Sequence, residues 1–113
     1  MVKYIDQFNI PETEKYPKRH IIRRRRRQIL VHSHLYYDKD ESLISDADFD
    51  KWCMELVELQ KRYPKAAENV EYHKEFKDFD GSTGIGLPYR TPNIMKLAER
   101  LLKNEIQQTR NKV

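Results

Sequence analysis

The sequence predicts an all-α protein, and three observations lead to this fold class. Apolar residues recur at helical spacing over residues 18–37, 46–63 and 91–107. Residues that favour helix ends stand beside these stretches. No stretch shows the strict alternation of apolar and polar residues that is typical of a strand. We therefore expect one domain over residues 1–113: a helical hairpin with a C-terminal amphipathic helix and an irregular N-terminal arm.

Composition divides this domain into four parts. Residues 1–17 hold two prolines and no sustained period, and predict an arm that packs on the helical body or on a partner. Residues 18–80 form the expected helical core, and 81–90 contain all three glycines and predict a flexible connector. Residues 91–108 form the expected C-terminal helix, with Thr91 as its N-cap. The arm is too apolar for a free tail because of four side chains: Tyr4, Ile5, Phe8 and Ile10.

The first expected helix contains a run of five arginines: Arg23, Arg24, Arg25, Arg26 and Arg27. Five consecutive residues go all the way round a helix, so some guanidinium groups must extend past the core edge or pair with acids. One interpretation is contact with phosphate, either of DNA or of a dinucleotide. The other is a solvated helix face with salt bridges, and the sequence leaves both open.

The second expected helix begins after Ser45, a good N-cap, and ends at Pro64. Asp46, Asp48 and Asp50 suit the positive end of the helix dipole. A shorter helix is plausible within 65–80. The apolar stripe of the second helix predicts a core face: Phe49, Trp52, Cys53, Leu56, Leu59 (or Gln60) and Tyr63.

Aromatic rings and carboxylates gather where the two helices meet an acidic loop. Tyr36 and Tyr37 close the first helix, and Asp46, Phe49 and Asp50 share one face of the second because they stand at i, i+3 and i+4. A well-capped helix hairpin would explain the loop, although it needs no large rings there. Flat rings beside carboxylates suit a flat cationic ligand that bears hydroxyl groups, such as a pyridinium riboside.

The run Tyr36-Tyr37, eight further residues, then Asp46-Ala47-Asp48-Phe49-Asp50, with Ile44-Ser45 before the aspartates, resembles the small N-terminal domain of bacterial NAD-dependent DNA ligases. The similarity extends through Leu56, Leu59 and Tyr63-Pro64-Lys65 and covers roughly residues 25–65. In that family the domain folds over the nicotinamide mononucleotide (NMN) half of NAD and orients it while a lysine of another domain attacks. The resemblance therefore implies NAD or NMN as the ligand of this chain.

The resemblance also assigns roles to individual residues. It places Tyr36 and Tyr37 at the aromatic pair that packs on the nicotinamide, and Asp46 and Asp50 at the carboxylates of the nicotinamide-riboside pocket. Phe49 stands where the family usually has tyrosine, so the ring is kept and the hydroxyl is lost.

Three other groups of residues have the types found in metal-binding or adenylation sites, but their residue pattern does not match those sites. His32 and His34 are two residues apart and point to different sides of a helix, so we expect no metal site there. The Asp38 loop lacks the glycine and glutamate of a calcium loop. The segment from Lys77 to Gly81 has one residue more than the Lys-x-Asp-Gly adenylation motif of ligases. We therefore expect no catalytic residues in this chain.

These observations favour a stand-alone NMN- or NAD-binding module that lacks the adenylation domain and does not seal nicks by itself. The alternative is a phage-type adaptor that binds DNA or a host or phage protein through the arginine-rich and C-terminal helices. The net charge of +4 and pI near 9.2 are compatible with either function. A single cysteine, the absence of a long apolar run and the absence of a signal pattern predict a soluble protein of the cytoplasm, the host cytosol if it is phage-encoded.

Overall fold

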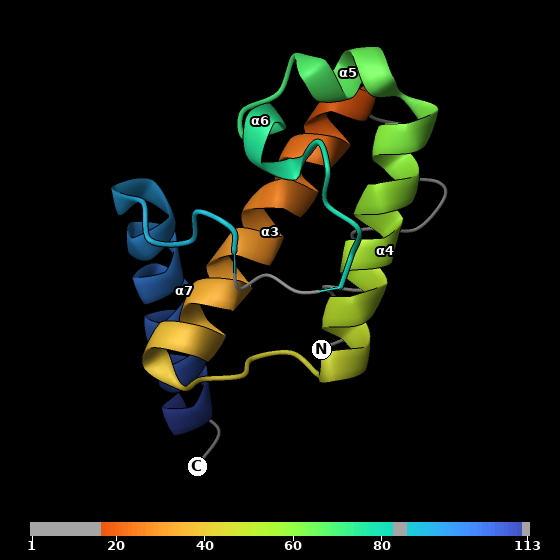
Figure 1. Ribbon diagram of the computed structural model, residues 1–113. Coiled ribbons are helices and arrows are strands. Elements are labelled where there is room, and N and C mark those ends of the chain that lie inside the picture. Colours follow the sequence, from red (N-terminus) through yellow and green to blue (C-terminus); the bar gives the residue numbers. More distant parts are fainter. Residues whose placement is uncertain (1–16, 83–85, 112–113) are drawn as a thin grey trace.

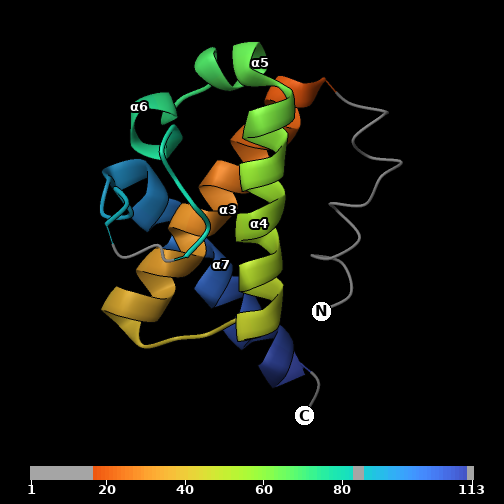
Figure 2. The same cartoon turned by 45° about the vertical axis from the view of Figure 1, so that its right-hand side comes forward.

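The computed structural model describes residues 17–82 and 86–111 and is helical, without strands in those ranges, which confirms the predicted all-α class. The long helices α3 (Lys18–Lys39) and α4 (Asp46–Arg62) lie side by side (Figure 1). The short helices α5 (Pro64–Glu68) and α6 (His73–Phe76) lie at one end of this hairpin, and α7 (Pro92–Asn111) packs on the other flank of α3 (Figures 1 and 2). The predicted N-terminal arm lies outside the described residues, apart from Pro17.

Helix α3 runs two residues beyond the predicted end, because Asp40 adopts a left-handed conformation with φ of 53° and closes it. Aspartate tolerates this conformation better than most residues. The backbone N–H groups of Asp40 and Glu41 both donate to the carbonyl of Leu35. The chain therefore leaves α3 abruptly, which brings the loop back over the side chains at the end of the helix.

The predicted caps of α4 and α7 form as expected. The hydroxyl of Ser45 accepts a hydrogen bond from the backbone N–H of Asp48 at 3.1 Å. The hydroxyl of Thr91 accepts one from the backbone N–H of Ile94 at 3.4 Å. Helix α4 ends at Arg62, and Pro64 both stops it and occupies the first turn of α5, where its missing N–H and fixed φ cost nothing.

The core lies between α3 and its neighbours on both flanks. Trp52 and Leu56 from α4 and Phe76 from α6 are buried with the apolar face of α3. Ile94 and Ala98 of α7 are buried too, so α7 belongs to the same core. Cys53 is buried, as its place on the predicted core face implies, and burial raises the pKa of its thiol to about 12, which makes the thiol unreactive.

Two arginines of the five-residue run are inside the protein. The side chain of Arg26 donates to the carbonyls of Ala67, Val70 and Glu71 at 3.0–3.2 Å and to Oε1 of Gln60 at 2.8 and 3.0 Å. Burial lowers the pKa of Arg26 to about 10, so the guanidinium stays charged at neutral pH. Arg26 thereby donates to carbonyls at and just after the end of α5 and holds this corner of the chain against α3.

Arg25 is also 0% exposed. Its guanidinium carbon lies 4.9 Å from the Trp52 ring, and its Nη2 lies 3.9 Å from the carboxylate of Glu55. Arg25 and Arg26 therefore offer no guanidinium group at the surface, and Arg23, Arg24 and Arg27 are the arginines of the run that are exposed. The helix buries both residues because they fall on the face that packs against α4, α5 and α6.

Candidate functional site

The five residues that the sequence predicted as a ligand site lie together at one pocket. This pocket of about 260 Å³ lies between the end of α3, the acidic loop and the start of α4. Predicted residues and newly found ones line it: His32, Ser33, Tyr36, Tyr37, Glu41, Ser42, Leu43, Ile44, Asp46, Phe49, Asp50 and Ser82. Ser82 is the one described residue of this group that comes from beyond the helical hairpin.

The three predicted rings have different surroundings. Tyr36 is 55% exposed and Tyr37 is 38% exposed, although most large rings of a small domain are buried. The two tyrosine rings meet edge to face with their centres 5.0 Å apart. Phe49 is half-buried and packs against the core. The tyrosines are therefore the rings that a ligand can reach most easily.

The polar residues give the pocket a negative character. Asp46 and Asp50 are exposed at the first turns of α4, and Glu41 is exposed on the loop that faces them. None of the described lining residues is a lysine or arginine. Three carboxylates around accessible rings favour a cationic planar group over an anionic one, since both the carboxylates and the ring faces attract positive charge.

His32 forms part of the pocket wall, although its sequence pattern did not predict this role. Its ring is buried and meets Trp52 at 5.2 Å with a 65° angle between planes. Burial lowers the pKa of His32 to about 4, so the ring is neutral at pH 7. The position of His32 four residues before Tyr36, on the same helical face, was the available signal for its place in the pocket.

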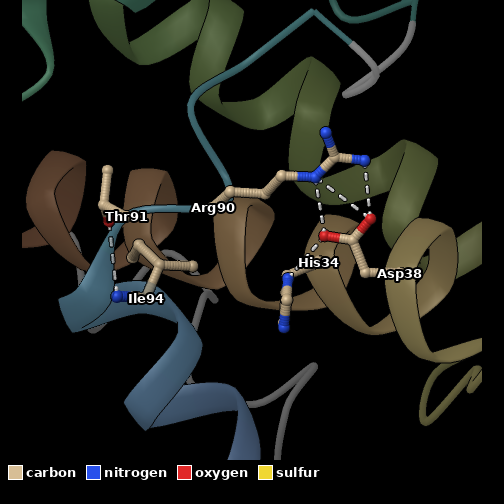
Figure 3. Close-up of polar contacts among 5 residues, drawn as sticks. All are labelled: His34, Asp38, Arg90, Thr91 and Ile94. Atoms are coloured by element: carbon tan, nitrogen blue, oxygen red, sulfur yellow. Dashed lines mark hydrogen bonds and ion pairs between the residues drawn. The ribbon is translucent and has the colours of Figure 1, made fainter.

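A second polar cluster lies at the last turns of α3, where Asp38 follows Tyr37 in the sequence. The guanidinium of Arg90 donates to both carboxylate oxygens of Asp38, with distances of 2.8–3.2 Å (Figure 3). Asp38 also lies 2.9 Å from Nδ1 of His34, one turn earlier on α3. Hydrogen bonds from Arg90 and His34 hold the pKa of Asp38 below its usual range, and Asp38 raises the pKa of Arg90. We call these three residues the Asp38 network.

The remaining arginines of the run line a different cavity. Arg23, Arg24 and Arg27 are exposed and border a groove of about 520 Å³ between α3 and α7, together with Arg100. Arg23 and Arg27 both pair with the carboxylate of Glu71. His32 borders this groove as well as the pocket. The structure thus separates the predicted cationic residues from the predicted ring and carboxylate residues.

The two histidines considered as metal ligands point into different surroundings, His32 to the pocket and His34 to Asp38. Across residues 17–82 and 86–111, no three histidine, cysteine or acidic side chains gather as a group that could hold a metal ion. In the same ranges no helix has the length and apolar character needed to cross a membrane.

Comparison with known proteins confirms the resemblance seen in the sequence. The model of the family described as "DNA ligase-like, N-terminal NAD+-binding domain" matches residues 15–70. Residues 15–70 are therefore similar to the N-terminal NAD+-binding domain of DNA ligases, and we call them the ligase-like domain. This ligase-like domain contains α3, α4 and α5, and therefore all five predicted pocket residues. Helix α7 and the Arg90 side chain lie outside the matched range.

Curated relatives support the same region. A DNA ligase of Pseudothermotoga lettingae is 41% identical over 58 residues, which is 51% of this chain and 8% of the ligase. A DNA ligase of Chlorobium luteolum is 45% identical over 40 residues, which is 35% of this chain and 6% of the ligase. A DNA ligase of Cytophaga hutchinsonii is 52% identical over 33 residues, which is 29% of this chain and 5% of the ligase. The chain thus spans less than a tenth of the length of these relatives. No solved structure matches it.

Proposed function

We propose that the ligase-like domain binds the NMN half of NAD, or free NMN, in the pocket between α3 and α4. The observation that carries this proposal is the convergence of Tyr36, Tyr37, Asp46, Phe49 and Asp50 on one pocket. The accessible tyrosine rings offer faces to the nicotinamide, and the carboxylates offer acceptors for the ribose hydroxyls and a counter-charge for the pyridinium. The match to an NAD+-binding domain family gives independent support.

The expected affinity is modest. A cation over an aromatic face contributes about 0.5–2 kcal/mol, and a hydrogen bond to a charged group contributes about 1.5–3 kcal/mol. Since the described lining residues supply no cationic partner for the phosphate, these contributions correspond to a Kd between about 1 μM and 1 mM. The pocket would hold and orient the nicotinamide side of the dinucleotide, which is the side that leaves when an adenylyl group is transferred.

Calorimetric titration tests this proposal. NMN and NAD should bind, whereas reduced NMN, which carries an uncharged ring, should bind more weakly because the cation–π and carboxylate attractions are lost. Tyr36→Ala and Asp50→Ala should abolish binding while the helical content survives. Phe49→Tyr should leave binding unchanged or tighten it, because it restores the hydroxyl usual in the family. Asp78→Ala, an exposed aspartate outside the lining set, serves as the control.

Two results would contradict the proposal. One is the absence of NMN and NAD binding at millimolar ligand. The other is equal affinity for wild type, Tyr36→Ala and Asp50→Ala.

We further propose that these 113 residues bind NAD without taking up its adenylyl group, because Lys77 lies in a segment with altered spacing. Incubation with labelled NAD should leave no stable adenylyl-lysine on the chain, and stoichiometric labelling would refute this part.

The groove between α3 and α7 favours a second candidate function, contact with DNA phosphates. Arg23, Arg24, Arg27 and Arg100 line it, and Val31 and Leu101 provide apolar surface. If these arginines bind duplex DNA, affinity should fall steeply with salt, with about 0.9 added to the logarithmic slope for each neutralised phosphate. Replacing Arg23, Arg24 and Arg27 by glutamine should flatten the slope. An absence of binding to duplex at low salt would exclude this function.

A further inference from the structure

The end of α3 is held by residues that lie outside the ligase-like domain. Tyr89 and Arg90 stand just before Thr91, the N-cap of α7, about fifty residues along the chain from the tyrosine pair that lines the pocket. Tyr89 is buried in the core, although the segment around it has no regular structure. Both residues contact the last turns of α3, one through a ring and the other through a charge.

The ring of Tyr89 stacks on that of Tyr37, with centres 5.5 Å apart and 24° between planes. Because an aromatic ring has two faces, this stack leaves only one face of Tyr37 for other contacts. Tyr37 also meets Tyr36 edge to face. The three rings therefore form a chain from the core to the most exposed ring of the pocket, and Tyr89 is its buried end.

Arg90 fixes the same turn of α3 from the outside. Its two-pronged contact with Asp38 sets the guanidinium plane, and the guanidinium carbon lies 5.4 Å from the Tyr89 ring. Asp38 is adjacent to Tyr37 in sequence, and its second hydrogen bond ties it to the buried ring of His34 (Figure 3). One carboxylate thus joins α3 to the segment that opens α7, where Thr91 caps the helix.

We infer that Tyr89 and Arg90 are positioning residues for the proposed NMN pocket, which they serve by fixing the ring orientation of Tyr37 and thereby that of Tyr36. This inference rests on the proposed function. Neither residue lines the pocket, so they act through the tyrosine pair. A side chain held in place before the ligand arrives loses less conformational freedom on binding, and the affinity rises accordingly.

The test combines NMN titration with NMR of the Tyr37 ring protons in the free protein. Arg90→Ala and Tyr89→Leu should each weaken NMN binding about threefold to tenfold. Both should shift the Tyr37 ring signals, since Tyr89→Leu removes the ring current of Tyr89 and Arg90→Ala releases the contacts that hold Tyr89 against Tyr37. Arg90→Lys, which keeps the charge but not the two-pronged contact, should fall between wild type and Arg90→Ala. Tyr89→Phe keeps the stacked ring and should bind nearly as wild type does.

Arg62→Ala is the matched control, because Arg62 is an exposed arginine that pairs with Glu58 on α4 and lines none of the cavities described above. Arg90 is 71% exposed, so its replacement should leave the chain folded. If wild type binds NMN and the folded Arg90→Ala and Tyr89→Leu variants bind it equally well, the positioning role of Tyr89 and Arg90 is refuted while the proposed function stands. Weaker binding with unchanged Tyr37 signals also overturns it. If wild type binds no nicotinamide nucleotide, the proposed function falls and the inference falls with it.

Discussion

Arg26 shows how a charged residue can be a structural one. Its side chain is 0% exposed, yet it contacts three backbone carbonyls and the amide oxygen of Gln60. The amide nitrogen of Gln60 donates in turn to the carbonyl of Phe76 at 2.9 Å. Arginine suits this place because its five N–H donors form a fixed planar fork, which lysine lacks.

We predict that Arg26→Ala destabilises the protein by about 3–5 kcal/mol, because it removes the hydrogen bonds of the guanidinium group to buried carbonyls and opens a cavity. Arg26→Lys should recover only part of this loss. Urea unfolding followed by circular dichroism measures both values. Arg62→Ala, which removes an exposed ion pair, should change stability by less than about 1 kcal/mol. An Arg26→Ala variant as stable as this control would contradict the proposed structural role.

Because His32 is buried and its pKa is lowered, we predict that the stability of the protein depends on pH. Its pKa is lowered from 6.5 to about 4 in the folded protein, so the unfolded chain takes up a proton first as pH falls. The contribution of neutral His32 to the free energy of unfolding is complete above about pH 6.5 and is lost as pH falls towards 4. The largest loss of stability from this group is about 3 kcal/mol. His32→Gln should therefore lose less stability than wild type between pH 7 and pH 4.5.

Thermal or urea unfolding at several pH values measures this difference, and the comparison with wild type cancels the titration of groups that both proteins share. His20→Gln is the control, since His20 is an exposed histidine on the same helix. Parallel pH profiles for wild type and His32→Gln would show that burial of His32 is not coupled to folding.

At the residue scale, the sequence predicted the pocket residues because their types and spacing agreed with both a helical face and a known domain. The sequence did not show which arginines of the run are buried. Arg26 enters the core because it donates to carbonyls that stand more than forty residues later in the chain. The roles of Tyr89 and Arg90 depend on contacts across a similar separation with Tyr37 and Asp38. Local pattern carries no information on such distant pairs.

At the element scale, the three long helices were predictable because apolar residues recur at helical spacing in each and two of them have capping side chains. The short helices α5 and α6, of five and four residues, were not resolved from one another. A helix of one turn has no measurable period and depends on tertiary contacts, here those of Arg26 with the carbonyls at the end of α5.

Gly81 is a position beside α4 where a side chain should destabilise the protein. It has φ of +85°, and a Cβ atom there would lie 2.8 Å from Sδ of Met54 on α4. We expect Gly81→Ala to cost about 1–2 kcal/mol, through backbone strain and the displacement of Met54. Gly86→Ala is the matched control, because nothing lies within 4 Å of its Cβ position. Equal unfolding midpoints for the two variants would contradict this account.

At the scale of the whole molecule, α3 is the central element. Helix α4 packs on one flank and α7 on the other, while α5 and α6 lie at one end of the α3–α4 hairpin (Figure 1). The pocket belongs to the contact between α3 and α4, whereas the arginine-lined groove belongs to the contact between α3 and α7. One helix therefore supplies residues to both candidate sites.

The arrangement around Arg26 also has a kinetic consequence. The hairpin of α3 and α4 joins segments close in sequence, whereas the contacts of Arg26 with Ala67, Val70 and Glu71 close chain segments of 41–45 residues. Closing the longer segments costs more chain entropy, so these contacts should form after the hairpin and be largely absent from the folding transition state. Removal of the guanidinium would then accelerate unfolding far more than it slows folding. The buried arginine would thus determine how long the native state persists more than how fast it is reached.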